Sequence, residues 1–127
     1  MNAKQFNEFF GYIVSEVKST RDAGQDEYAS PSDVFDDFVK TAELTGTTPG
    51  MVLYTFLNKH MRGIGAFIRG RDSQREHVSG RIKDAIVYLM LLWAMVEEEE
   101  SKETLNQEQA DQMATQDGYW EATTTEE

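Results

Sequence analysis

Apolar residues recur along this chain at the helical spacing of three and four positions, in four separate stretches. The first stretch predicts a helix from about Ala3 to Asp22. Its apolar stripe consists of Phe6, Phe9, Phe10, Ile13, Val14 and Val17. We expect this helix to end near Ala23-Gly24, because glycine favours the position that follows a helix. No stretch stands out as a strand, so the predicted fold class is all-α, a compact bundle of four helices.

The second and third helices are predicted from matching start signals, a hydroxyl cap followed by proline at the first helical position. These signals are Ser30-Pro31 for the second helix and Thr48-Pro49 for the third. Asp33 lies three residues after Ser30 and completes a capping box. Gly46 is expected to end the second helix. The stripe of the third comprises Val52, Leu53, Phe56, Leu57 and Met61.

The fourth helix is predicted from about Gln74 to Glu98, with Ser73 and Glu76 as its capping box. It holds the longest apolar run, residues 85–96, which is shorter than the roughly 20 residues that span a membrane. This helix is apolar on nearly all of its faces, and the other helices of one chain can rarely bury so much apolar surface. We therefore expect a homodimer with this helix at or near the interface. The alternative is a central helix wrapped by the other three.

From Glu97 the composition changes to an acidic segment without a sustained apolar period. We expect residues 1–96 to form the α-helical domain and residues 97–127 to be a largely disordered acidic tail. Tyr119 and Trp120 are the sole aromatic residues of this tail. The tail either keeps the protein soluble or docks on another protein.

Composition and charge narrow the classes of function. The chain of 127 residues has no cysteine and a net charge of −11. Eleven acids and one base in residues 97–127 account for −10 of this charge, so residues 1–96 carry −1. Direct duplex DNA binding is not expected, because such proteins are basic overall. The N-terminus lacks a signal-peptide pattern, and the absence of cysteine fits a reducing cytoplasm.

Positive charge is concentrated between residues 59 and 83. The basic residues there are Lys59, Arg62, Arg69, Arg71, Arg75, Arg81 and Lys83. A cationic surface next to the apolar core suits a small phosphorylated ligand. The Walker pattern Gly-x-x-x-x-Gly-Lys is absent, so the protein is not a P-loop kinase.

Two helix faces are candidates for the site. Lys59 and Arg62 are three residues apart and share one face, while Asp84 and Tyr88 are four apart and share another. If the third and fourth helices pack antiparallel, Asp84 would orient the two cations towards a phosphate. The alternative is an interhelical salt bridge that only closes the bundle. His60 is a further candidate, as a general base or as a structural histidine.

The order Arg21, Tyr28, Phe35/Phe38, Lys59-x-x-Arg62 and Asp84-x-x-x-Tyr88 resembles the small all-α domain of phages called nucleotide-modification-associated. That domain is grouped loosely with MazG-like nucleotide pyrophosphohydrolases. The resemblance covers roughly residues 16–96, and Ala29 stands where the family has glycine. It implies a role in phage nucleotide metabolism, with the site between helices or across a dimer.

On this reading Lys59, Arg62 and Arg21 or Arg71 contact phosphates, and Tyr28 or Tyr88 stacks on the base or hydrogen-bonds to it. Asp84 is the catalytic candidate. Any reaction would be pyrophosphate hydrolysis or phosphoryl transfer on a (deoxy)nucleotide.

Metal binding is predicted at Asp37 and Asp84. MazG-like enzymes hold magnesium through Glu-Glu-x-x-Glu and Glu-x-x-Asp motifs, and neither occurs in residues 1–96. Magnesium needs only one or two protein carboxylates in addition to the phosphates of the substrate. Whether the protein is an enzyme therefore stays open. The alternative function is a non-enzymatic acidic protein that binds or inhibits a host protein.

Overall fold

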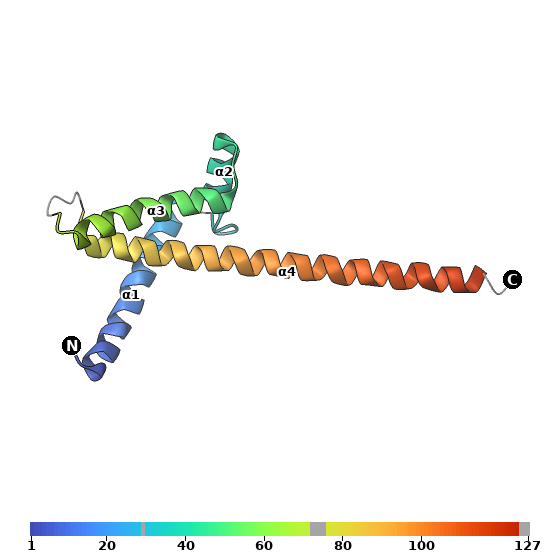
Figure 1. The fold of residues 1–127 in the computed structure, drawn as a ribbon, viewed down its shortest axis with the longest axis horizontal. Helices are drawn as coiled ribbons and strands as arrows, with labels where there is room; N and C mark the ends of the chain where they lie inside the picture. The colour runs from blue at the N-terminus through green and yellow to red at the C-terminus, as the bar shows by residue number, and fades with distance from the viewer. Residues whose placement is uncertain (29, 72–75, 125–127) are drawn as a thin grey trace. The chain divides into compact units, whose positions relative to one another are not determined.

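The computed structural model describes residues 1–28, 30–71 and 76–124, with side chains described as far as Thr115. These residues form four helices and no strand, which confirms the all-α class (Figure 1). The helices are α1 (Ala3–Tyr28), α2 (Asp36–Thr45), α3 (Pro49–Ile68) and α4 (Val78–Thr124). No helix in the described ranges combines the length and the hydropathy needed to cross a bilayer.

The chain divides into two units, Met1–Leu92 and Trp93–Glu127, which are described separately. The first unit contains α1, α2, α3 and the first turns of α4, and it holds the core. The second unit contains the rest of α4. Every described side chain from Val96 to Thr115 is exposed, so this segment adds nothing to a core.

The core of the first unit is small. Its buried apolar residues are Val17, Phe38, Ala42, Val52, Leu53, Leu57 and Ala85. Leu53 is the one described large side chain with 0% exposure. α3 and the first turns of α4 run side by side in opposite directions (Figure 1), which is the antiparallel arrangement that the predicted site requires. This antiparallel pair determines which side chains can meet.

The cap signals around α3 are confirmed. The Thr48 hydroxyl accepts a hydrogen bond from the Met51 amide at 3.2 Å, and Pro49 opens the helix. Gly46 closes α2 in the left-handed region, at φ 69° and ψ 35°. Glycine occupies that region without steric penalty, which explains its place there.

The predicted starts and ends of the other helices are wrong in part. α1 continues through Gly24 to Tyr28. Just past its end, the Ser30 backbone carbonyl accepts a hydrogen bond from the side-chain amide of Gln25. The predicted second helix starts late, at Asp36. Ser30 accepts from the Asp33 amide, and the Asp33 carboxylate accepts from the Phe35 amide, so the expected capping residues form a turn.

α4 begins at Val78 and extends beyond the predicted end near Glu98 to Thr124. The predicted cap at Ser73 lies outside the described residues. Glutamate, lysine, glutamine and alanine are good helix formers. Pairs four residues apart support the helix further, since Lys102 meets Glu98 at 3.1 Å and Gln107 donates to Asp111.

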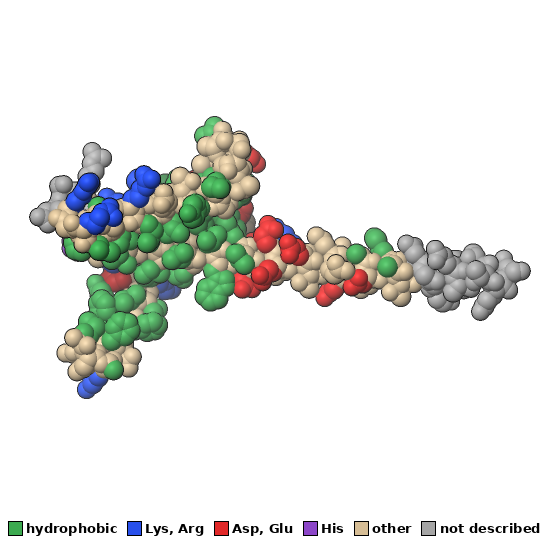
Figure 2. All heavy atoms as spheres, viewed as in Figure 1, with side chains coloured by type: hydrophobic (Ala, Val, Ile, Leu, Met, Phe, Trp, Pro, Cys, Tyr) green, Lys and Arg blue, Asp and Glu red, His purple; other side chains and the backbone are tan. Residues whose placement is uncertain are grey.

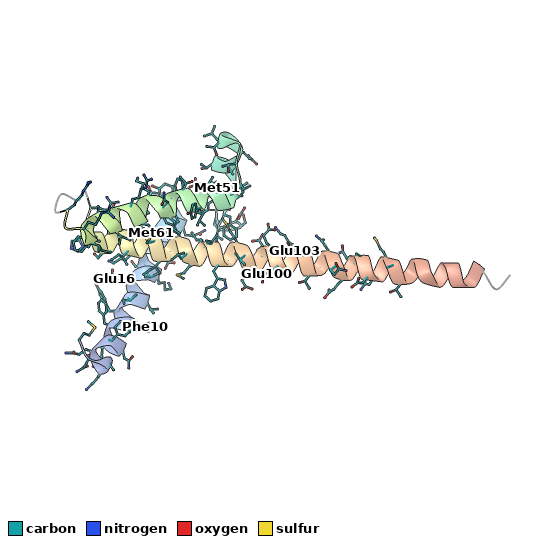
Figure 3. All side chains as sticks on the ribbon, viewed as in Figure 1. Phe10, Glu16, Met51, Met61, Glu100 and Glu103 are labelled. Atoms are coloured by element: carbon teal, nitrogen blue, oxygen red, sulfur yellow. The ribbon has the colours of Figure 1, made fainter. Side chains whose placement is uncertain are left out.

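α1 contacts the rest of the first unit through its C-terminal half. Glu16 accepts a hydrogen bond from Lys83 of α4 at 2.9 Å. Towards the N-terminus the stripe around Phe10 lies open to solvent (Figure 3). The predicted first apolar stripe is therefore buried only where Val17 reaches the core.

Candidate functional site

A cavity of about 240 Å³ lies inside the first unit, between its helices. It is lined by Thr20, Arg21, Gly24, Gln25 and Tyr28 of α1, Val34 before α2, Asp37 and Phe38 of α2, Phe56 of α3, and Asp84, Val87, Tyr88 and Leu91 of α4. The lining therefore combines apolar and aromatic side chains with charged and polar groups.

Four rings from α2, α3 and α4 pack together, and three of them, Phe38, Phe56 and Tyr88, form a wall of the cavity. The ring centroid of Tyr88 lies 6.3 Å from Phe38, 6.2 Å from Phe56 and 5.5 Å from His60. The Phe38 and Phe56 centroids are 6.2 Å apart. These distances lie in the range of roughly 4.5–7 Å for favourable ring pairs. The wall is thus a packed unit that fixes Tyr88 at the cavity.

Tyr88 carries its hydroxyl in a negative environment. Burial raises the pKa of Tyr88 above its ordinary value of 10.0, and the charges of Asp84 and Asp37 raise it further. The hydroxyl therefore stays protonated at neutral pH. It is available as a hydrogen-bond donor to a ligand in the cavity.

Asp84 lies at the cavity with a side chain that is 37% exposed. Partial burial raises the pKa of its carboxyl above 3.8; a positive charge on His60 opposes the rise and the Glu76 charge adds to it. His60 Nε2 is 3.8 Å from the carboxylate oxygen. That distance is too long for a direct hydrogen bond.

Arg21 is the cation among the residues that line this cavity. Its guanidinium donates to the Asp22 carboxylate at 3.0 Å, and the side chain is 44% exposed. Tyr28 is 61% exposed on the same helix. A hydrogen bond to Glu27 raises the pKa of Tyr28, with smaller contributions that include the Asp37 charge.

Five predicted site residues line this one cavity: Arg21, Tyr28, Asp37, Asp84 and Tyr88. Three others, Lys59, Arg62 and Arg71, are absent from its lining and are exposed. The predicted meeting of Asp84 with Lys59 and Arg62 is wrong, because the side chain of α3 that approaches Asp84 is His60. Figure 2 shows Lys and Arg side chains gathered on the surface towards the C-terminal end of α3.

Helical geometry explains this difference. His60 follows Leu53, Phe56 and Leu57 at spacings of seven, four and three, so it continues the buried face of α3. Lys59 is one position earlier, roughly 100° around the helix. The spacing after the apolar stripe was therefore the signal that could have selected His60.

Two arginines lie close against the backbone of α3. A Cβ atom at Gly63 would be 2.6 Å from Cδ of Arg81, so the Arg81 side chain crosses α3 at this glycine. Arg81 Nε is buried there without a hydrogen-bond partner among the described residues. At Gly65 the corresponding distance to the Arg69 guanidinium is 3.1 Å.

One further group consists of possible metal ligands that the sequence pattern did not predict to lie together. Ligand atoms of His60, Glu76 and Asp84 all lie within 4.8 Å of one another. Glu76 precedes α4 and is exposed. Asp37, the other predicted metal ligand, lines the cavity but does not belong to this group.

Comparisons with protein families, with curated proteins and with solved structures found no match to this chain.

Proposed function

We propose that the cavity of the first unit binds the base of a (deoxy)nucleotide, in keeping with a phage-type protein of nucleotide metabolism. The observation that carries the proposal is the convergence of Arg21, Tyr28, Asp37, Asp84 and Tyr88 on one cavity. These residues come from α1, α2 and α4, so they meet only in the folded chain.

The rings at the cavity supply the first part of the argument. A flat base gains roughly 1–3 kcal/mol from stacking on an aromatic side chain. Tyr88 is held in place by Phe38 and Phe56, whereas Tyr28 is exposed at the cavity. A base can therefore lie against a fixed wall and be covered by Tyr28.

The polar groups supply the second part. Bases present N–H donors and ring acceptors along one edge. Asp37 and Asp84 offer acceptors, and the protonated Tyr88 hydroxyl offers a donor. Amino groups of adenine, cytosine or guanine match the carboxylates better than a phosphate does, because like charges repel.

Size and charge favour an arrangement with the phosphates outside the cavity. Its volume of about 240 Å³ is below the roughly 300–1,000 Å³ of sites that enclose a drug-sized ligand. The base therefore fills the space, and Arg21 at the lining contacts the first phosphate through its exposed guanidinium. If the bound nucleotide reacts, the chemistry is hydrolysis or transfer at a phosphate.

The test is a thermal-shift and calorimetric titration of the full chain with the common deoxynucleotides, with and without magnesium. A ligand at 100 times its Kd should add about 2.7 kcal/mol to the free energy of unfolding. Asp37→Asn should reduce the response to the preferred base, while Asp26→Asn, an exposed change of the same charge on α1, should not. Product analysis of the same mixtures separates binding from turnover.

Lys59→Ala decides between two arrangements of the phosphates. Lys59 lies outside the cavity lining, so we expect nucleotide affinity to be retained, whereas Arg21→Ala should weaken it. The proposal is overturned if no nucleotide shifts the melting temperature, or if Asp37→Asn and Asp26→Asn respond equally.

A second candidate function is the binding of a host protein through the acidic segment of this chain, residues 97–127. The observation in its favour is that all described side chains from Val96 to Thr115 are exposed, including Leu105 and Met113. Deleting residues 97–127 should abolish binding to a basic partner protein and leave nucleotide affinity unchanged. Retained partner binding would exclude this candidate.

A further inference from the structure

His60, Glu76 and Asp84 come together from three parts of the first unit. His60 lies on α3, Glu76 precedes α4, and Asp84 lies in the second turn of α4. Their ligand atoms are within 4.8 Å of one another. An imidazole and two carboxylates around one point are a set of donors suited to a divalent cation.

The unsatisfied imidazole is an independent observation at the same place. The His60 side chain is only 13% exposed, and its Nδ1 is buried without a hydrogen-bond partner in the described part of the chain. Nε2 is 3.8 Å from Asp84, so it also lacks a direct hydrogen bond to that carboxylate. Nε2 is therefore the nitrogen open to a cation between His60 and Asp84, because one ion cannot bind both nitrogens of the same ring.

The negative charges of Glu76 and Asp84 also favour a bound cation. Glu76 and Asp84 bring two carboxylates close together, and neither forms an ion pair with a described lysine or arginine. Arg81, the nearest arginine in sequence to Asp84, lies against Gly63 and forms no ion pair within the described ranges. A bound cation would satisfy both carboxylates and Nε2 of the imidazole together.

We infer that His60, Glu76 and Asp84 bind one first-row divalent cation, of the Mn²⁺ or Zn²⁺ type. Magnesium prefers oxygen ligands alone, whereas an imidazole nitrogen favours transition metals. Metal–ligand bonds of roughly 2.0–2.2 Å require the three groups to close in by about 1 Å. Glu76 is exposed and outside the helices, so it can move inwards.

Three protein ligands leave coordination positions open for water or a phosphate oxygen. Asp84 belongs both to this group and to the cavity lining. The ion would therefore lie at the edge of the cavity, on the side where Asp84 faces a bound base. This last step rests on the proposed function, whereas the metal site itself does not.

The test is a titration of the metal-free full chain with MnCl₂, in the absence of nucleotide, followed by the loss of the electron paramagnetic resonance signal of free Mn²⁺. We expect one tight site per chain that survives a tenfold excess of Mg²⁺. Glu76→Gln should weaken it at least about tenfold. Because Glu76 is exposed, this variant should fold normally, which circular dichroism can check. His60→Ala should have the same effect on Mn²⁺.

Two matched controls separate this site from weak binding along the acidic segment. Glu103→Gln removes an equivalent charge from an exposed position of α4, and His77→Ala removes the exposed histidine beside Glu76. Both should bind Mn²⁺ as the wild type does. The inference is overturned if the wild type has no tight site, or if Glu76→Gln and Glu103→Gln bind equally well.

The metal and nucleotide experiments can fail separately. Tight Mn²⁺ binding without a response to any nucleotide would contradict the proposed function alone. Nucleotide binding with no tight Mn²⁺ site would contradict the metal site alone.

Discussion

The ion pair between Glu16 and Lys83 joins α1 to α4 at a separation of 2.9 Å. The hydrogen bond from Lys83 is the main cause that lowers the pKa of Glu16 below 4.5, and the same bond raises the pKa of Lys83 above 10.5. A lowered carboxyl pKa contributes stability above the unfolded value, and that stability is lost as the pH falls through the folded value. The raised pKa of the Lys83 amine also contributes stability, and this contribution is lost as the pH rises through the pKa of Lys83 in the folded protein.

We therefore predict that Glu16→Gln lowers the melting temperature at pH 7 and has a vanishing effect once the pH is well below 4.5. The measurement is circular dichroism melting of both proteins between pH 3 and pH 8. Glu8→Gln, an exposed glutamate of the same helix, is the control and should melt like the wild type. A difference that persists unchanged at pH 3 would contradict this account.

The candidate site could be predicted in part from single residues. Asp84 and Tyr88, four apart, do share a face and both line the cavity. Arg21, Tyr28 and Asp37 join them there. Lys59 and Arg62 do not line the cavity, because the buried stripe of α3 determines which face of this helix meets α4, and that face carries His60. Charge alone does not identify that face. Glu76 had a local explanation as a cap, which hid its proximity to His60.

At the scale of elements, helix existence was more predictable than helix ends. The caps at Thr48 and Gly46 were correct because each is a local interaction. The predicted end of α1 at Gly24 was wrong, because the cost of an interior glycine, about 1 kcal/mol, is small compared with the packing of a whole helix. At Ser30 the hydroxyl does accept from the Asp33 backbone amide, as a capping box requires, but the Asp33 carboxylate accepts from the Phe35 amide and a turn forms in place of a helix start.

We predict that Thr48→Ala lowers the free energy of unfolding by about 1 kcal/mol, because the Met51 amide loses the hydroxyl that accepts its hydrogen bond. Urea denaturation followed by circular dichroism measures this difference. Thr47→Ala is the matched control one residue earlier and should change stability little. Equal losses in the two variants would show that the cap does not matter.

At the scale of the whole molecule, the expected homodimer with α4 at or near its interface stays a prediction, and α1 offers a further exposed apolar face. The N-terminal half of α1 leaves five apolar side chains open. Phe6, Phe9, Phe10, Tyr12 and Val14 are 53%, 42%, 58%, 55% and 52% exposed. One buried aromatic side chain covers roughly 150–250 Å². This stripe thus supplies a large part of the roughly 800 Å² per partner that a stable interface buries, and a second copy offers a matching stripe.

We expect the full chain to be dimeric by size-exclusion chromatography with light scattering, and Phe10→Glu to shift it to monomer. The reason is that a charge in the middle of the stripe would be desolvated in the dimer. Ser15→Glu places the same charge at an exposed position on the opposite side of α1 and should leave the dimer intact. A wild-type monomer at all concentrations would contradict the prediction.

The close approach of Arg81 to Gly63 has a consequence for how this sequence can vary. An alanine at 63 would bring its methyl carbon to 2.6 Å from the Arg81 side chain, so any residue larger than glycine must displace the guanidinium. The contact is with the far end of a flexible side chain, so the guanidinium can move aside. Gly63→Ala is therefore expected to release the Arg81 side chain from α3 at little cost in stability.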